Sequence, residues 1–149
     1  MAPRSALNPR SAYLVHFALV MSLAAITGVF WLISDTVNVD VSLFTGRILR
    51  YAAVAELVAA GAIVSRVRSG MPLQRADTDL DVWWSDNGRR VMVTWALAHS
   101  SAITAAVFWL LSGDTIILAA VVVAAILLLL RLGPGHWRSE EPRPSRLVP

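Results

Sequence analysis

The chain contains no cysteine and no lysine, and it carries few charges of any kind. The lack of cysteine excludes disulfides, thiolate metal sites and cysteine nucleophiles. All 13 basic residues are arginine, a bias that is typical of a GC-rich bacterial genome. Only 15% of the 149 residues are charged and 56% are hydrophobic, whereas ordinary soluble domains have about 25% charged and about 45–50% apolar residues. This apolar excess predicts that much of the chain is surrounded by lipid.

Several functional signatures are also missing. We find no glycine-rich phosphate loop, no zinc-binding motif and no nucleophile elbow. The arginines lie beside apolar segments and form no separate basic face, so nucleic acid is not an expected partner. These absences favour a role other than that of an enzyme, and no cofactor is expected.

Four apolar runs dominate the chain, at residues 13–33, 51–64, 91–111 and 115–130. Because about 20 helical residues cross a hydrocarbon core of about 30 Å, and because the runs do not alternate as barrel strands do, they predict transmembrane helices. The first run is too long for a cleaved signal peptide, so we expect it to be retained. The predicted fold class is an all-α membrane protein, a four-transmembrane-helix bundle within residues 1–132. Its helices are expected at about 12–34, 47–67, 90–112 and 115–132, with a disordered cytoplasmic tail at 133–149.

The arginines predict how these helices cross the membrane. Eleven of the thirteen lie in the two terminal tails and in the loop between the second and third helices, and only Arg47 and Arg50 lie in the other loops. Cytoplasmic loops are enriched in arginine, so the protein is expected in the inner (plasma) membrane with both termini cytoplasmic. Aromatic residues, which concentrate at the membrane surfaces, agree with this orientation. Those expected at the outer surface are Trp31 and Trp109, and those at the inner surface are Tyr13, Trp83, Trp84 and Trp137.

The first and third helices resemble each other in sequence. Residues 19–34 read LVMSLAAITGVFWLIS and residues 97–112 read LAHSSAITAAVFWLLS. The shared VFWL-x-S ending indicates two duplicated helical hairpins, arranged as a parallel repeat about an axis along the membrane normal. Similar constraints at the membrane surface are the alternative explanation.

Small residues four apart on these two helices predict close helix packing. In the first helix they are Ala24 and Gly28, and in the third they are Ala102 and Ala106. Such pairs let two backbones approach closely, so we expect all four at helix contacts within the bundle, with contact against a second copy as a further option. The fourth helix is apolar all round and suits a lipid-facing position.

Glu56 is the main candidate for a functional residue. It is a single carboxylate in an otherwise apolar run, and a charged carboxylate in hydrocarbon costs several kcal/mol. We expect it to point into the bundle, within reach of Thr27, His99, Ser100 or Thr104. Two interpretations remain open: it serves as the coupling group of a proton-coupled carrier, or it has a structural role, bonded to these hydroxyls or paired with a nearby arginine.

His16 and His99 are candidates for the ligation of a b-type haem, since two histidines on different membrane helices hold such a group. Their expected depths differ, which argues against it. We expect His99 to bond to a neighbouring helix, with Glu56 as one candidate partner, and His16 to lie near the membrane surface.

The two longer loops give weaker signals. Asp77, Asp79 and Asp81 begin like a calcium-binding loop, but Val82 and Gly88 stand where that loop needs glycine and glutamate, so no metal is expected. Three local structures are predicted instead: a surface patch at the membrane made of Leu80, Val82, Trp83 and Trp84, a turn at residues 86–88, and an extended segment within residues 36–46.

Three functions fit these features. The first is a non-enzymatic accessory or scaffold subunit of a membrane complex. The second is a small homo-oligomeric channel or proton-coupled carrier that uses Glu56. The third is a b-haem or membrane-enzyme subunit. The expected partners are the lipid bilayer and either further copies of the chain or a larger membrane complex.

Overall fold

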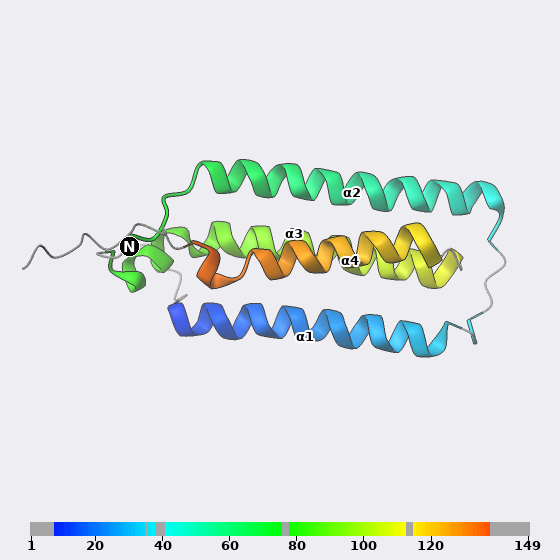
Figure 1. The fold of residues 1–149 in the computed structure, drawn as a ribbon, viewed down its shortest axis with the longest axis horizontal. Helices are drawn as coiled ribbons and strands as arrows, with labels where there is room; N and C mark the ends of the chain where they lie inside the picture. The colour runs from blue at the N-terminus through cyan, green and yellow to red at the C-terminus, as the bar shows by residue number, and fades with distance from the viewer. Residues whose placement is uncertain (1–7, 35, 38–40, 76–77, 113–114, 138–149) are drawn as a thin grey trace, which may run out of the picture.

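The described part of the chain folds into four long helices that lie side by side with their axes roughly aligned, as the computed structural model shows (Figure 1). The structure describes residues 8–34, 36–37, 41–75, 78–112 and 115–137. The helices are α1 (Pro9–Ile33), α2 (Leu43–Ser69), α3 (Leu80–Ser112) and α4 (Thr115–Arg131), followed by a short 3-10 helix, η1 (Pro134–Trp137). The described ranges contain no strand, so the predicted all-α fold is confirmed. Of the extended segment expected within residues 36–46, residues 43–46 are helix and residues 38–40 lie outside the described ranges.

Three of the helices are long and apolar enough to cross a membrane, namely α1, α2 and α3. They have 25, 27 and 33 residues, and at 1.5 Å rise per residue even the shortest spans about 37 Å. The fourth, α4, has only 17 residues and is about 25 Å long, less than a hydrocarbon core of about 30 Å. The described part of the molecule is therefore all-helical, with three helices long and apolar enough to span a membrane and one shorter apolar helix.

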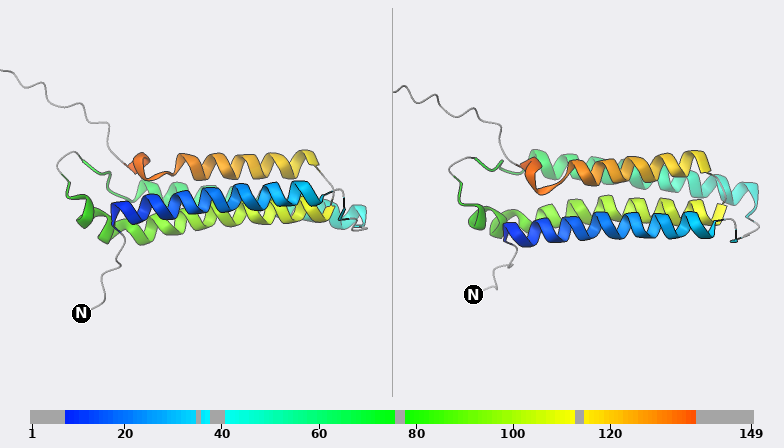
Figure 2. Two further views of the ribbon diagram at one scale, coloured as in Figure 1. Left: turned by 90° about the horizontal axis from the view of Figure 1, so that it is seen from below. Right: turned by 60° about the horizontal axis from the view of Figure 1, so that its bottom comes forward.

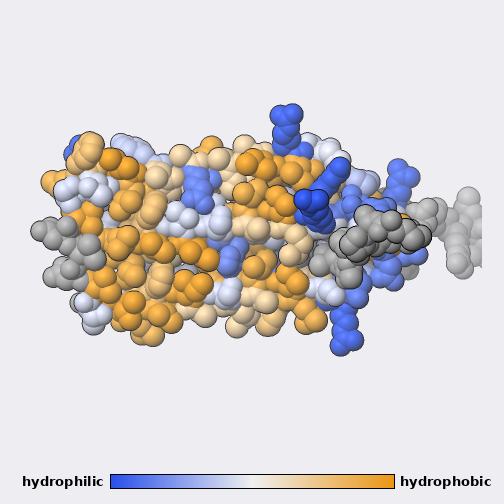
Figure 3. Space-filling view, turned by 180° about the vertical axis from the view of Figure 1, so that it is seen from behind, coloured by the Kyte–Doolittle hydropathy of each residue, from blue (hydrophilic) through white to orange (hydrophobic). Residues whose placement is uncertain are grey.

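The surface agrees with a membrane environment. The face drawn in Figure 3 is mainly hydrophobic along the bundle, with a few hydrophilic patches midway and a hydrophilic region at one end. We call this end, where α1 and α3 begin and α2 and α4 end, the arginine-rich end. Its described arginines are Arg10, Arg66, Arg68, Arg75, Arg89, Arg90 and Arg131.

Polar caps explain why the first three helices begin before their apolar runs. The Asn8 side chain accepts a hydrogen bond from the Ser11 backbone N–H at 2.8 Å, and Ser42 accepts one from Thr45 at 3.2 Å. Asp79 accepts bonds from the N–H groups of Asp81 and Val82. Each cap satisfies backbone donors that the first helical turn leaves free. Hydrophobicity predicted the membrane segments, but these side chains fix where the helices start.

The pair formed by α3 and α4 lies at the centre, with α1 and α2 on opposite sides of it (Figures 1 and 2). Helix α3 packs against all three others, whereas α1 and α2 have little or no contact with each other. Thus α3 and α4 form a packed hairpin, and α1 and α2 do not. The duplicated hairpins predicted from the sequence are not shown by this arrangement.

Helix α4 turns one face inward and one outward. Its buried residues include Leu118, Val122 and Leu129, and its exposed residues include Val123 and Leu127. The expected lipid-facing position is therefore correct for only one side of the helix. The other side is part of the central pair.

A cluster of tryptophans closes the arginine-rich end. Trp83, Trp84, Trp95 and Trp137 are all buried, and neighbouring rings lie 5.1 to 6.4 Å apart between centroids. The Trp83 indole N–H donates to the carbonyl of Pro72 at 3.0 Å, and the carbonyl of Trp137 accepts from the N–H of Gln74 at 2.8 Å. The cluster thus ties the α2–α3 loop and η1 to the start of α3.

This cluster corrects three predictions. Trp83 and Trp84 are core residues rather than part of a patch on the membrane surface, because the extended start of α3 is itself covered. The turn expected at residues 86–88 is helix, and the Asn87 amide donates to the Trp83 carbonyl at 3.1 Å. The tail expected to be disordered from residue 133 contains η1 with Pro134 and Trp137 buried; residues 138–149 lie outside the described ranges.

Candidate functional site in the middle of the bundle

Glu56 on α2 faces α3, where two hydroxyl groups approach its carboxylate. Ser100 Oγ and Thr104 Oγ1 each donate to Glu56 Oε1 at 3.4 Å. Residues four apart lie on the same side of a helix, so both hydroxyls reach the same oxygen. The predicted contact with the third helix is confirmed at Ser100 and Thr104. Neither of the other two candidate partners, Thr27 and His99, shares a recorded hydrogen bond with Glu56.

These two bonds satisfy the carboxylate only weakly. Both distances exceed the usual O–H···O range, which ends near 3.0 Å. Ser100 has a single hydroxyl hydrogen, and the carbonyl of Leu97 competes for it at 3.3 Å. Among the described residues no hydrogen bond reaches Glu56 Oε2, and Glu56 itself is partly exposed. The chain therefore leaves hydrogen-bonding capacity of Glu56 unused at the bundle surface.

His99 makes a second polar contact, on the other side of α3. Its Nε2 atom lies 2.9 Å from Ser22 Oγ on α1. The Ser22 hydroxyl also lies 2.9 Å from the Leu19 carbonyl, so its single hydrogen can serve only one of the two contacts, and the tautomer of His99 sets which group donates in the Ser22–His99 pair. The expectation that His99 bonds to a neighbouring helix is confirmed, although the partner is Ser22 and not Glu56.

Together these side chains form a polar band across the middle of the bundle. We define the polar band as Ser22, His99, Ser100, Thr104 and Glu56. Its central members belong to α3 and reach α1 on one side and α2 on the other, so they join two helices that do not pack against each other. Hydrogen bonds of this kind hold membrane helices together. The sequence pointed to Glu56, but it carried no signal that pairs Ser22 with His99.

The two histidines are not arranged for one haem within this chain. His16 Nε2 bonds to the carbonyl of Leu129 on α4 at 2.9 Å, and its ring lies edge-on to Trp95, 5.0 Å away between centroids. His99 is bonded at the level of Ser22, six residues further along α1, which is about 9 Å along the helix axis. Each imidazole is thus engaged by a different neighbour at a different depth.

The predicted packing residues divide into two groups. Ala102 and Ala106 are fully buried, as expected. Ala24 and Gly28 are exposed, and a Cβ atom at Gly28 would meet nothing within 4 Å. For contacts within the chain the prediction at these two residues was wrong. The spacing of small residues defined a helix face, but the face of α1 that packs inward is the opposite one, which carries Ala12 and Leu23.

The aspartates before α3 have a structural role where they are described. Asp79 caps the helix, as shown above, and Asp77 lies outside the described residues. In the part of the chain that the structure describes, no three histidine or acidic side chains are grouped as they would be around a metal ion.

Comparisons with models of known protein families, with curated protein sequences and with solved structures found no match in any of the three. The chemistry of the chain at the polar band is the acceptance and donation of hydrogen bonds within an apolar surface.

Proposed function

We propose that the protein is a non-enzymatic accessory subunit of an inner-membrane complex. In this proposal the edge between α2 and α3 docks against a membrane helix of a partner protein, and that helix offers a hydrogen-bond donor to Glu56. The observation that carries the proposal is the partly exposed carboxylate with two long hydrogen bonds to its own chain.

Energetics support a partner at this position. An acidic side chain in the membrane is costly when it faces lipid, and such groups usually pair with another polar group. Ser100 and Thr104 give Glu56 only weak hydrogen bonds, because both are 3.4 Å long and the Ser100 hydroxyl is shared with the Leu97 carbonyl. A hydroxyl, amide or basic group from a second protein would complete its hydrogen bonding without exposing it to hydrocarbon.

The surface around Glu56 also suits helix docking. Ala52, Ala55 and Ala59 are exposed on α2 beside it. Small side chains let a second backbone approach closely, which brings a short donor within reach of the carboxylate. We further propose that the arginine-rich end faces the cytoplasm, because arginine concentrates in cytoplasmic loops.

A second candidate function rests on the same residue. In a homo-oligomer, Glu56 side chains from several copies could face a shared path and couple transport to protons. Four helices are too few to enclose a substrate path within one chain, so this function requires at least two copies. The third candidate, a haem subunit, has less support because His16 and His99 are engaged separately.

Site-specific photo-cross-linking in native membranes tests the docking proposal. A photo-reactive amino acid at Ala59, one turn from Glu56, should capture one defined partner protein. The same probe at Leu14, exposed on α1, is the control and should not capture it. Glu56→Leu should abolish the Ala59 adduct, whereas Glu56→Gln should retain part of it because an amide keeps some of the hydrogen bonds. The matched variant Val58→Leu, on an exposed part of the same helix, should leave the adduct unchanged.

The same experiment separates the alternatives. An adduct with a second copy of this chain, together with loss of pH-dependent flux in liposomes on Glu56→Gln, would replace the accessory role with the carrier. Absence of any adduct at Ala59 would refute docking at this edge. A Soret band in the absorption spectrum of the purified protein would restore the haem function.

A further inference from the structure

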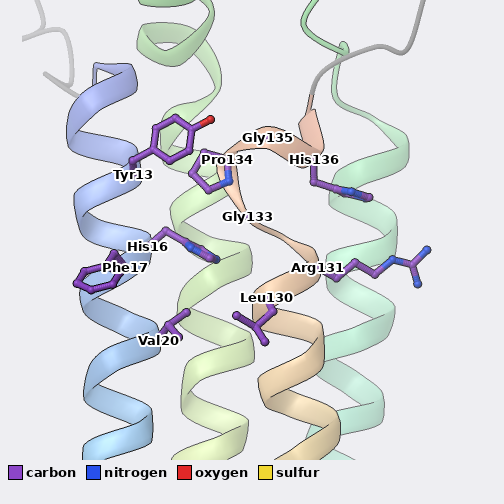
Figure 4. Close-up of a pocket in the computed structure, with 10 residues that line it drawn as sticks. All are labelled: Tyr13, His16, Phe17, Val20, Leu130, Arg131, Gly133, Pro134, Gly135 and His136. Atoms are coloured by element: carbon purple, nitrogen blue, oxygen red, sulfur yellow. The ribbon is translucent and has the colours of Figure 1, made fainter.

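An open cleft lies between α1 and the end of α4 at the arginine-rich end (Figure 4), with a volume of about 640 Å³. Tyr13 and His16 reach from α1 toward the short segment Gly133, Pro134 and Gly135. This segment leaves the cleft open because Gly133 and Gly135 have no side chains to fill it. A Cβ atom at Gly133 would lie 3.3 Å from the Leu130 carbonyl and 3.6 Å from the His16 ring.

Three cationic side chains gather on the other side of this segment. Arg131 and His136 line the cleft but turn their polar groups away from α1 and toward α2 (Figure 4). The pKa of His136 is lowered, first by burial and then by the positive charges of Arg68 on α2 and of Arg131. Both arginines are therefore close enough to disfavour the protonated form of His136.

Nothing in the described part of the chain balances these charges. No salt bridge joins Arg68 or Arg131 to an acidic side chain among the described residues, and His136 Nε2 is enclosed without a hydrogen-bond partner. The two arginines occupy the last turns of α2 and α4, where the helix dipole favours positive charge. The dipole explains each arginine alone, but it does not explain why the Nε2 atom of His136 is enclosed without a hydrogen-bond partner beside them.

We propose that Arg68, Arg131 and His136 bind the phosphate group of an anionic phospholipid. Arginine binds phosphate through directed, charge-assisted hydrogen bonds, and basic pockets between membrane helices bind lipid headgroups. A lipid is favoured over free phosphate by position: the exposed side chain of Leu127, four residues before Arg131 on the same side of α4, offers apolar surface to an acyl chain. This site is separate from the polar band and does not depend on the proposed docking at Glu56.

Lipid titration of the full-length protein in a neutral detergent tests the site. The probes are short-chain phosphatidylglycerol, short-chain phosphatidylcholine and inorganic phosphate, each followed by the NMR signals of the His136 ring. Phosphatidylglycerol should shift these signals saturably and raise the pKa of His136, because an anion then faces the imidazole. Phosphatidylcholine, which has no net charge, should have a much smaller effect.

Substitution of single arginines tests which residues bind the phosphate group. Arg68→Gln and Arg131→Gln should each weaken phosphatidylglycerol binding by about tenfold or more, since each removes a charge-assisted hydrogen bond. Arg66→Gln is the matched control: it lies on the same last turn of α2 but is not among the charges that act on His136. Unchanged melting temperatures show that the variants are folded.

The possible outcomes are distinct. Saturable binding of phosphatidylglycerol that is lost in Arg68→Gln and Arg131→Gln but kept in Arg66→Gln establishes the site. Equal binding of both lipids, or equal loss in all three variants, overturns it. Binding of inorganic phosphate as tight as that of phosphatidylglycerol shows that the site takes free phosphate and overturns the lipid assignment.

Discussion

At the scale of single residues, two side chains from other helices complete the end of α4. The last carbonyl groups of a helix have no partner within it and need one from elsewhere. His16 donates to the carbonyl of Leu129, and the buried Trp95 indole donates to the carbonyl of Leu132 at 2.8 Å. A short apolar helix is thereby anchored from both α1 and α3.

Replacing Trp95 tests this anchor. Trp95→Phe keeps an aromatic ring but removes the N–H, which leaves the Leu132 carbonyl buried without its donor. We expect a loss of about 1–3 kcal/mol in the free energy of unfolding, seen as a lower melting temperature in detergent. Trp31→Phe, at a position that is 66% exposed, should have almost no effect. Equal melting temperatures for the two variants would contradict the role of the indole N–H.

The lowered pKa of His136 gives a pH-dependent prediction. Because the folded state disfavours the imidazolium, protonation stabilises the unfolded state more, so stability should fall as the pH drops below the ordinary value of 6.5. Arg68→Gln removes one repelling cation and should raise the pKa of His136. NMR titration in the absence of anionic lipid measures the change, with Arg66→Gln as the control. A pKa at or above 6.5 in the unmodified protein would contradict the described surroundings.

Residue-level predictions succeeded where hydrophobicity and helical spacing determined them. Glu56 stood out because the run around it is apolar, and the four-residue spacing of Ser100 and Thr104 identified two hydroxyls that reach it. Ser22 and His99 could not be paired, because the rotation of α1 about its own axis is not encoded in either residue. The carbonyl partners of His16 and Trp95 could not be predicted either, because every residue has a backbone carbonyl and the sequence does not indicate which one accepts the bond.

At the scale of elements, buried alanine on α3 permits the dense centre of the bundle. Ala98, Ala102, Ala105 and Ala106 are all fully buried, and α3 packs against every other helix. A helix with three neighbours needs small residues on several faces, which accounts for this concentration of alanine in α3. The exposed small residues of α1 have no such role within the chain.

A pair of equivalent substitutions distinguishes these two helices. Ala102→Leu adds three carbon atoms to a fully buried position and should destabilise the protein by about 1–3 kcal/mol or more through overpacking. Gly28→Leu, at the position of α1 that aligns with Ala106, meets open space and should leave the melting temperature of the monomer nearly unchanged. Equal losses for both variants in a monomeric preparation would mean that α1 is rotated relative to the structure.

At the scale of the whole molecule, charge is concentrated at one end. Helix α1 begins and α4 ends there, and most of the described arginines are found there, whereas Arg47 and Arg50 lie near the opposite end. This asymmetry is the basis for the proposed orientation in the membrane.

Reporter fusions test the orientation. A fluorescent protein that folds only in the cytoplasm should be active when fused after Pro149, and alkaline phosphatase at the same position should be inactive. A phosphatase inserted between α1 and α2 should be active. Phosphatase activity after Pro149 would reverse the orientation or show that α4 does not cross the membrane.

The number and order of helices were predictable from the sequence, but their arrangement was not. Apolar runs gave all four helices, since lipid imposes length and hydrophobicity. Those same constraints make the runs alike, so they do not tell which pairs pack together. The likeness between residues 19–34 and 97–112 suggested equivalent positions, yet α3 is central and α1 peripheral. The burial of Trp83 and Trp84 was missed because it depends on η1, which begins 50 residues after Trp84 and carries little hydrophobic signal.

The separation of α1 from α2 has a consequence for biogenesis. During translation the first half of the chain enters the bilayer before the second half exists, and its two helices have little or no surface with which to pack against each other. They must remain independent spans until α3 and α4 arrive and take places between them. The second half, by contrast, contains two helices that pack directly against each other in the folded chain. A ribosome that stalls after α2 therefore releases two unassembled helices that quality-control proteases of the membrane can recognise.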